Sequence, residues 1–179
     1  ANVNRLRKAH IKYITGKIFL LQGYPQNALR EFTDIARSDS QKWASFSRKE
    51  IANLAHAFNF ISISDATQEL EKIYFAWHTQ SFREQVLHDL IYLYTENQDY
   101  HRAIEREYEL YKMQTDEVKK AQTKQQMITT IENLFLGHVN IKIAAINILA
   151  LYDSFKWIAV RSPRYNSIVR RLVDRLVAV

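Results

Sequence analysis

The chain has no cysteine, and its 179 residues include only three glycines and two prolines. The absence of cysteine excludes disulfide bonds and thiolate chemistry. Neither glycine nor proline occurs between Gln26 and Leu136. A sheet-rich protein needs such turn residues about every 8–12 positions. The sequence therefore predicts an all-α protein whose helices are joined by short polar turns.

Long apolar runs are also missing. No stretch approaches the roughly 18 consecutive apolar residues of a membrane-spanning helix. Residues 1–10 are basic but lack the apolar core of a signal peptide. We expect a soluble protein without a membrane span, located in the cytoplasm or the periplasm. Since the chain starts without Met and ends within the helical pattern RRLVDRLVAV, we interpret it as part of a longer protein.

The residue patterns of common active sites are absent as well. The chain contains six histidines, but neither HExxH nor a pair of histidines three to five residues apart. Glu84 with His88, and His101 with Glu105, could each share a helix face, but two ligands do not complete a metal site. There is no GxSxG motif and no glycine-rich phosphate loop. We expect no metal, no cofactor and no enzymatic activity.

The residues that are present suit one globular domain, which we place at residues 1–179. Hydrophobic residues make up 47% of the chain and charged residues 25%, as in folded rather than disordered proteins. Apolar residues recur at helical spacing along most of the sequence. The predicted helices are 4–22, 25–37, 41–60, 64–79, 81–97, 100–117, 119–137, 140–159 and 163–178.

Several residues predict where these helices begin and end. Gly23 can adopt the left-handed conformation that terminates a helix, and Pro25 suits a first helical turn. The pair Ser162-Pro163 has the same starting role. Ser64 with Asp65 is expected to open the fourth helix, and Gly137 to close the seventh. The polar stretch 112–127 predicts a solvated helical link.

A repeated hairpin pattern organises the chain and is clearest in residues 9–40. Small residues occur at Gly16 and Ala28, where two helices can approach closely, and the aromatic residues Phe19 and Phe32 flank this contact. Looser copies span residues 47–73, 84–110 and 125–151. One alanine from each unit forms a ladder with spacings of 38, 37 and 41 residues: Ala28, Ala66, Ala103 and Ala144.

Three polar residues depart from this pattern. Glu50 and Asn53 replace apolar residues in the second unit, and Glu107 stands where an aromatic residue belongs in the third. With these exceptions, residues 9–151 resemble degenerate tetratricopeptide (TPR) repeats, whose period is about 34 residues. The resemblance implies an α-solenoid of about four helix-turn-helix hairpins, followed here by a closing C-terminal helix.

The TPR resemblance also implies a function. TPR proteins are non-enzymatic scaffolds that bind a peptide or helix of a partner protein in a concave groove lined by the first helix of each repeat. Transferring the family's groove positions to the first and third units gives His10, Tyr13, Lys17, Leu20, Gln85, His88, Tyr92 and Glu96.

The distribution of charge leaves two alternatives open. The net charge of +6 comes from the ends, since residues 1–17 hold five basic residues and no acid, and residues 161–175 hold five arginines and one acid. Nucleic acid could bind such helices. Alternatively, the chain could self-associate or dock onto the rest of a longer chain. The residues of this predicted basic surface are Arg5, Arg7, Lys8, Arg161, Arg164, Arg170, Arg171 and Arg175.

Overall fold

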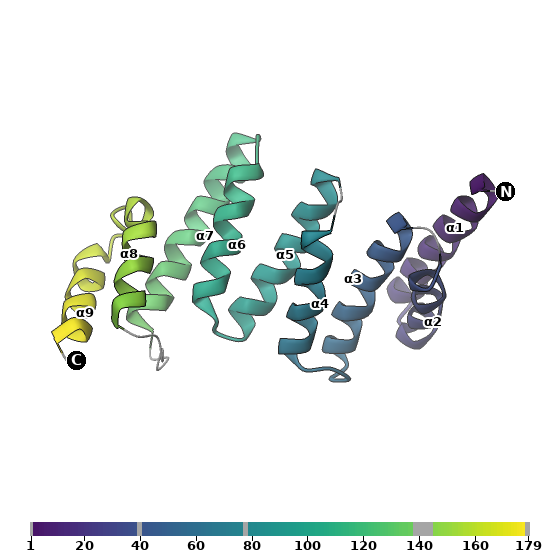
Figure 1. Ribbon diagram of the computed structural model, residues 1–179, viewed down its shortest axis with the longest axis horizontal. Coiled ribbons are helices and arrows are strands. Elements are labelled where there is room, and N and C mark those ends of the chain that lie inside the picture. Colours follow the sequence, from purple (N-terminus) through teal and green to yellow (C-terminus); the bar gives the residue numbers. More distant parts are fainter. Residues whose placement is uncertain (1, 39–40, 77–78, 138–144, 178–179) are drawn as a thin grey trace. The chain divides into compact units, whose positions relative to one another are not determined.

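The protein was analysed as a computed structural model, which describes residues 2–38, 41–76, 79–137 and 145–177. Within these ranges the chain forms α-helices and no strand, which confirms the predicted all-α class (Figure 1). The helices are α1 (Asn2–Leu21), α2 (Pro25–Ala36), α3 (Gln41–Ala57), α4 (Ile63–Phe75), α5 (Gln80–Glu96), α6 (Tyr100–Met113), α7 (Glu117–Leu136), α8 (Ala145–Ala159) and α9 (Tyr165–Val177).

The chain divides into two compact units, Ala1–Asp89 and Leu90–Val179. The boundary falls inside α5, which is one continuous helix. The first unit contains α1 to α4 and the start of α5, and the second contains the end of α5 and α6 to α9. That the two units act as a single domain stays a prediction.

The first turn has the form that its sequence predicts. Gly23 has φ of 79°, in the left-handed region. The backbone N–H of Tyr24 donates to the carbonyl of Phe19 at 2.8 Å, and that of Gly23 donates to Leu20 at 3.1 Å. These two bonds make a Schellman motif, which satisfies the last carbonyls of α1. Pro25 then opens α2 at its first helical position.

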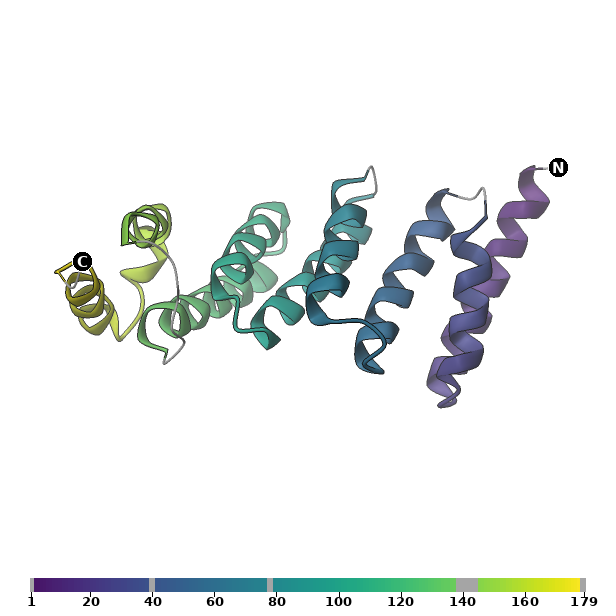
Figure 2. The ribbon, with the colours of Figure 1, turned by 60° about the horizontal axis from the view of Figure 1, so that its bottom comes forward.

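The α1/α2 hairpin is held by contact between a glycine and an aromatic ring, and its two helices lie side by side (Figure 2). A Cβ atom added to Gly16 would lie 2.6 Å from Cε1 of Phe32, so only glycine allows this approach. Ala28 and Phe32 are both fully buried. The small-plus-aromatic pattern of residues 9–40 therefore describes a real helix–helix contact.

The second unit has a core of its own. Ile131 of α7 and Ile158 of α8 are fully buried in it, and α9 contributes Ile168 and Leu172.

Of the alanine ladder, Ala28, Ala66 and Ala103 are fully buried, whereas Ala144 lies outside the described residues.

Three of the predicted helices extend more than one residue beyond the observed C-terminal end. The helix predicted at 41–60 ends at Ala57, because Asn59 takes a positive φ of 57° and closes it as Gly23 closes α1. The helix predicted at 64–79 ends at Phe75 and begins one residue early, since Ser62 is the N-cap and accepts a hydrogen bond from the Asp65 N–H. The helix predicted at 100–117 ends at Met113.

The stretch 112–127, predicted as a solvated helical link, is helical except at residues 114–116, and some of its residues are buried. Residues 114–116 form a turn, and the Asp116 carboxylate accepts hydrogen bonds from the N–H groups of Val118 and Lys119. Gln114 is buried and accepts a hydrogen bond from the hydroxyl of Thr123. Residues 114–116 thus form the turn of the α6/α7 hairpin, whereas residues 117–127 belong to α7, where Thr123 and Met127 are buried.

The ends of the last helices differ in detail. Gly137 closes α7 as predicted. The helix predicted at 163–178 begins at Tyr165 because residues 160–164 form turns. Ser162 is buried in these turns, where its hydroxyl accepts from the Arg164 N–H and donates to Glu132. The helix predicted at 140–159 ends at Ala159, while residues 140–144 lie outside the described residues.

Candidate interaction surfaces

The α1 part of the predicted groove is engaged with α3. The hydroxyl of Tyr13 donates to Glu50 Oε1 at 3.0 Å, and Lys17 Nζ lies 3.2 Å from both Glu50 oxygens. The Tyr13 ring packs against the rings of Phe32 and Trp43. Burial raises the pKa of Tyr13, and the Glu50 carboxylate raises it further. Tyr13 is thus held as a neutral hydrogen-bond donor within the first unit.

Glu50 belongs to a larger polar network. Lys49 Nζ lies 3.6 Å from Glu50 Oε1 and 3.1 Å from Asp89 Oδ2. The side-chain amide of Asn53 donates to the same Asp89 oxygen at 2.8 Å. Both Lys49 and Glu50 are buried on α3. The network connects α1, α3 and the first-unit part of α5.

This network gives a physical reason for two departures from the repeat pattern. Glu50 and Asn53 replace apolar residues of the pattern, and both make polar contacts with neighbouring helices. The sequence shows that Glu50 and Asn53 depart from the repeat pattern. It does not show which residues they contact, because Asp89, for example, lies 36 residues after Asn53.

The remaining predicted groove residues differ in exposure. The imidazole of His10 stacks on Trp43 with ring centroids 4.4 Å apart, and Leu20 is half-buried in the first core. On α5, by contrast, Gln85 and His88 in the first unit are exposed. So are Tyr92, with 66% of its surface accessible, and Glu96 in the second unit. His10 and Lys17 are exposed as well, but each of the four predicted residues on α1 contacts other residues of the first unit.

Sequence reasoning missed a second apolar face on α1. Ile11, Ile14, Ile18 and Leu21 have exposures of 64%, 45%, 46% and 89%. Their spacing of three and four residues places them on one side of the helix. The opposite side, with Ala9 and Gly16, is buried. We call these four exposed residues the α1 apolar face; the second stripe of isoleucines in residues 11–21 was the signal that could have revealed it.

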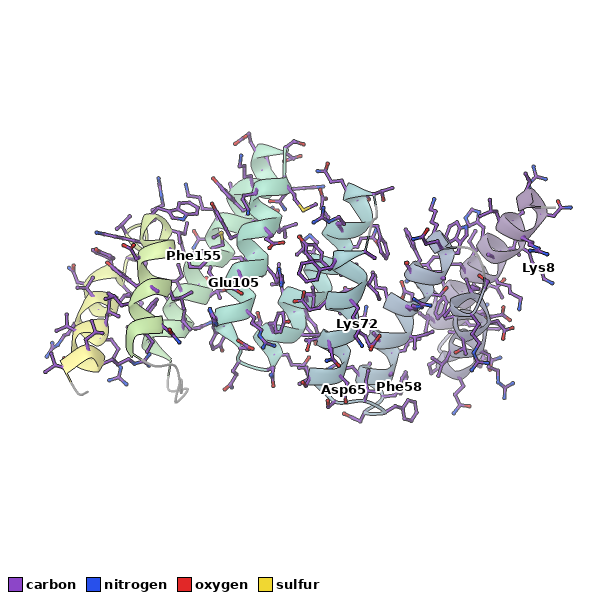
Figure 3. The ribbon with its side chains drawn as sticks, viewed as in Figure 1. Lys8, Phe58, Asp65, Lys72, Glu105 and Phe155 are labelled. Atoms are coloured by element: carbon purple, nitrogen blue, oxygen red, sulfur yellow. The ribbon has the colours of Figure 1, made fainter. Side chains whose placement is uncertain are left out.

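Two exposed aromatic residues follow the C-terminal end of α3. Phe58 and Phe60 flank Asn59, their ring centroids lie 6.3 Å apart in a stacked arrangement, and both are exposed. Phe58 is labelled in Figure 3. Both aromatic residues line a small depression of about 70 Å³ together with Pro25, Gln26, Leu29 and Leu54.

Two residues of the predicted basic surface line a pocket in the first unit. The pocket has a volume of about 640 Å³ and is formed by α1, α2 and the start of α3. Arg5 and Lys8 contribute to it, and Lys8 lies on the N-terminal half of α1 (Figure 3). Arg7 is exposed but does not line it. We call this the basic pocket; its described lining residues are Arg5, Leu6, Lys8, Ala9, Lys12, Asp34, Ile35, Arg37, Ser38, Gln41 and Lys42.

Three of the five predicted C-terminal arginines line one surface depression. Arg164, Arg170 and Arg171 line a shallow depression of about 290 Å³ in the second unit, together with Leu136, Ser167 and Asp174. Arg161 is exposed and does not line it. Arg175 is half-buried, and burial, followed by the nearby charge of Arg171, lowers its pKa.

No group of three potential metal ligands comes together among the residues that the structure describes, and the expectation of a non-enzymatic protein stays a prediction. No described helix combines the length and apolar character needed to cross a bilayer. No protein-family model matches the chain, and comparison with curated proteins gives no match.

Proposed function

We propose that this chain is a non-enzymatic protein–protein interaction module, an α-solenoid of TPR-like hairpins with a closing C-terminal helix. It binds a helix or peptide of a partner protein. The contact of Gly16 with Phe32 and the burial of Ala28, Ala66 and Ala103 support the TPR-like interpretation, because these positions let paired helices approach closely.

The α1 apolar face is the observation that carries the proposal. A helix with one buried and one exposed apolar side leaves aliphatic surface in water, at a cost of about 25 cal/mol per Å². Contiguous exposed apolar surface typically marks a protein interface. Phosphate backbones offer little to isoleucine and leucine side chains, so this face favours a protein partner. An amphipathic helix laid along Ile11, Ile14, Ile18 and Leu21 would bury them at helix-packing spacing.

The positive charge of α1 indicates which residues a partner helix would carry. α1 carries five basic residues and no acidic residue. Lys12 is paired with Asp34 and Lys17 with Glu50. We therefore propose a partner helix whose apolar seam is flanked by acids. The exposed residues of α5, Tyr92 above all, supply a further contact surface, since tyrosine is favoured at interfaces.

Site-specific photocrosslinking in the source cells tests this proposal. A photoreactive side chain at Ile14 should give a discrete crosslinked protein that persists after nuclease treatment. The same group at Val118, which is exposed on α7, is the matched control and should not give that product. Ile14→Asp with Ile18→Asp should abolish partner binding while unfolding free energy changes by no more than about 0.5 kcal/mol per site.

The crosslinking outcomes separate the alternatives. A product containing a second copy of the chain would favour self-association. The absence of any protein product at Ile14 would overturn the proposal.

Nucleic-acid binding is the second candidate function. The arginine-lined depression of the second unit is the observation that favours it. It predicts affinity for single- or double-stranded oligonucleotides that falls steeply as salt rises. Arg170→Glu with Arg171→Glu should then weaken binding, whereas substitutions on the α1 apolar face should leave it unchanged.

A further inference from the structure

We propose that the basic pocket of the first unit binds a phosphate monoester attached to an apolar group. The inference does not depend on the proposed function, because the pocket and the α1 apolar face share no residue. The pocket is basic, has apolar residues among its lining and is large enough for a small ligand.

The charge of the pocket suits a compact anion with more than one negative charge. Its described lining holds five cations and one carboxylate, a net charge of +4. That carboxylate, Asp34, is already paired with Lys12 at 2.7 Å, and this hydrogen bond holds its pKa below its usual range. Lys8, Arg37 and Lys42 are further cations of the lining. A phosphate monoester is close to dianionic at pH 7.5 and offers three acceptor oxygens, so it can engage several of them together.

The floor of the pocket adds a second requirement. Leu6, Ala9 and Ile35 lie among the cations, and Ala9 and Ile35 are buried. An apolar floor under a basic rim fits a ligand with an apolar group beside its phosphate. The start of α3, which contributes Gln41 and Lys42, adds the positive end of a helix dipole.

The size of the pocket favours a small ligand over a polymer. A volume of about 640 Å³ is within the usual range for small-molecule sites. Nucleic-acid binding instead needs a basic track extending over many phosphates. The pocket therefore points to a single phosphorylated group.

The pocket has neighbouring groups that can report binding. Lys42 Nζ lies 5.1 Å from the centroid of the Trp43 ring, and that ring also stacks on His10. An anion that draws Lys42 toward the pocket would change the surroundings of the Trp43 indole. Amide and indole NMR signals of Ser38, Lys42 and Trp43 are thus suitable probes in the full chain.

The experiment titrates four defined probes at pH 7.5 and low salt. Blocked phosphothreonine (N-acetyl, N-methylamide) carries phosphate and apolar groups, and glycerol 3-phosphate carries phosphate alone. Blocked glutamate and a ten-nucleotide single-stranded DNA complete the set. We expect blocked phosphothreonine to shift these signals saturably, with a Kd at least about tenfold below that of blocked glutamate.

Charge-reversal variants locate the binding. Lys8→Glu and Arg37→Glu should each weaken phosphothreonine binding about tenfold or more. Arg30→Glu makes the same change of net charge at an exposed α2 residue outside the pocket and should change Kd by less than about twofold. Because Lys8 is exposed, its reversal tests the pocket even if the Arg37 variant fails to fold.

The remaining outcomes are decisive. If glycerol 3-phosphate binds as tightly as phosphothreonine, the requirement for an apolar group is overturned. Weaker glycerol 3-phosphate binding would support a phosphorylated protein side chain as the source. The proposal is overturned if neither phosphate binds saturably, if glutamate binds equally well, or if the oligonucleotide binds more tightly and displaces phosphothreonine.

Discussion

Glu107 of the second unit has a strongly raised pKa. It is fully buried on α6, and its Oε1 accepts a hydrogen bond from the Thr130 hydroxyl at 2.8 Å. Burial raises its pKa to about 7, and the side-chain donors of Thr130 and Gln126 only partly offset this. The raised value means that the folded state prefers the protonated, neutral side chain.

This preference makes stability fall as pH rises. The contribution is fully present below the unfolded pKa near 4.5 and is lost as pH rises through about 7. The loss amounts to about 3 kcal/mol, at about 1.4 kcal/mol per pKa unit. Glu107→Gln, which stays neutral, should match the wild type near pH 4.5 and be more stable at pH 8. Urea unfolding across this range measures the difference.

Glu105→Gln is the matched control for that prediction. Glu105 lies two residues away on the same helix and is exposed (Figure 3). Its substitution should leave the pH profile of unfolding parallel to that of the wild type. A Glu107→Gln profile that also stayed parallel to the wild type would contradict a protonated Glu107.

Gly16 packs directly against the Phe32 ring. Gly16→Ala places a methyl group where only 2.6 Å separates it from the Phe32 ring, so we expect a loss of about 1–3 kcal/mol of unfolding free energy. Combining it with Phe32→Leu should cost less than the sum of the two single changes, because a smaller side chain makes room for the methyl group. Additive effects in urea unfolding would show that the two residues do not compete for space.

At the scale of elements, periodicity predicted the helices better than their ends. Apolar spacing placed each described helix within the predicted ranges or within two residues of them. Glycine and proline correctly marked the α1/α2 turn. However, α3 and α5 end through positive φ at Asn59 and Gln98. Non-glycine residues adopt a positive φ less readily than glycine, so the sequence around Asn59 and Gln98 does not predict that a helix ends there.

The candidate surfaces were predictable to a smaller extent. The repeat pattern identified presented residues on α5 but could not show that Tyr13 and Lys17 bind Glu50, since those contacts span 37 and 33 residues. The basic pocket combines predicted Arg5 and Lys8 with residues from two other helices. A one-dimensional pattern identifies which residues lie on one helix face, but not which neighbouring helix covers that face.

Glu50 of α3 connects this helix to Tyr13 and Lys17 of α1. Glu50→Ala removes a buried carboxylate and leaves the Tyr13 hydroxyl and the buried Lys49 with one partner fewer. We expect it to cost about 2–3 kcal/mol in urea unfolding. Lys17→Ala, at a partly exposed ion pair with the same Glu50, should cost no more than about 1 kcal/mol. Equal losses for the two variants would show that the burial of Glu50 does not govern this connection.

For the whole molecule, the central question is whether the two units unfold together. The unit boundary falls between Asp89 and Leu90 inside α5. This helix buries Phe82, Val86 and Leu87 on one side of the boundary and Leu90 and Ile91 on the other. Because one continuous helix has buried apolar residues on both sides of the boundary, unfolding of either unit should destabilise that helix. We therefore expect a single cooperative transition, in agreement with the predicted single domain.

The tryptophans make this expectation measurable. With Trp77 and Trp157 both replaced by Phe, the remaining tryptophan, Trp43, lies in the first unit, so fluorescence reports that unit while helical circular dichroism reports the whole chain. Ile131→Ala truncates a fully buried residue of the second core and should destabilise it by about 2–5 kcal/mol. If the chain unfolds as one domain, the fluorescence and dichroism midpoints in urea shift down together. A fluorescence midpoint that stays in place while part of the dichroism is lost earlier would establish that the first unit folds independently of the second.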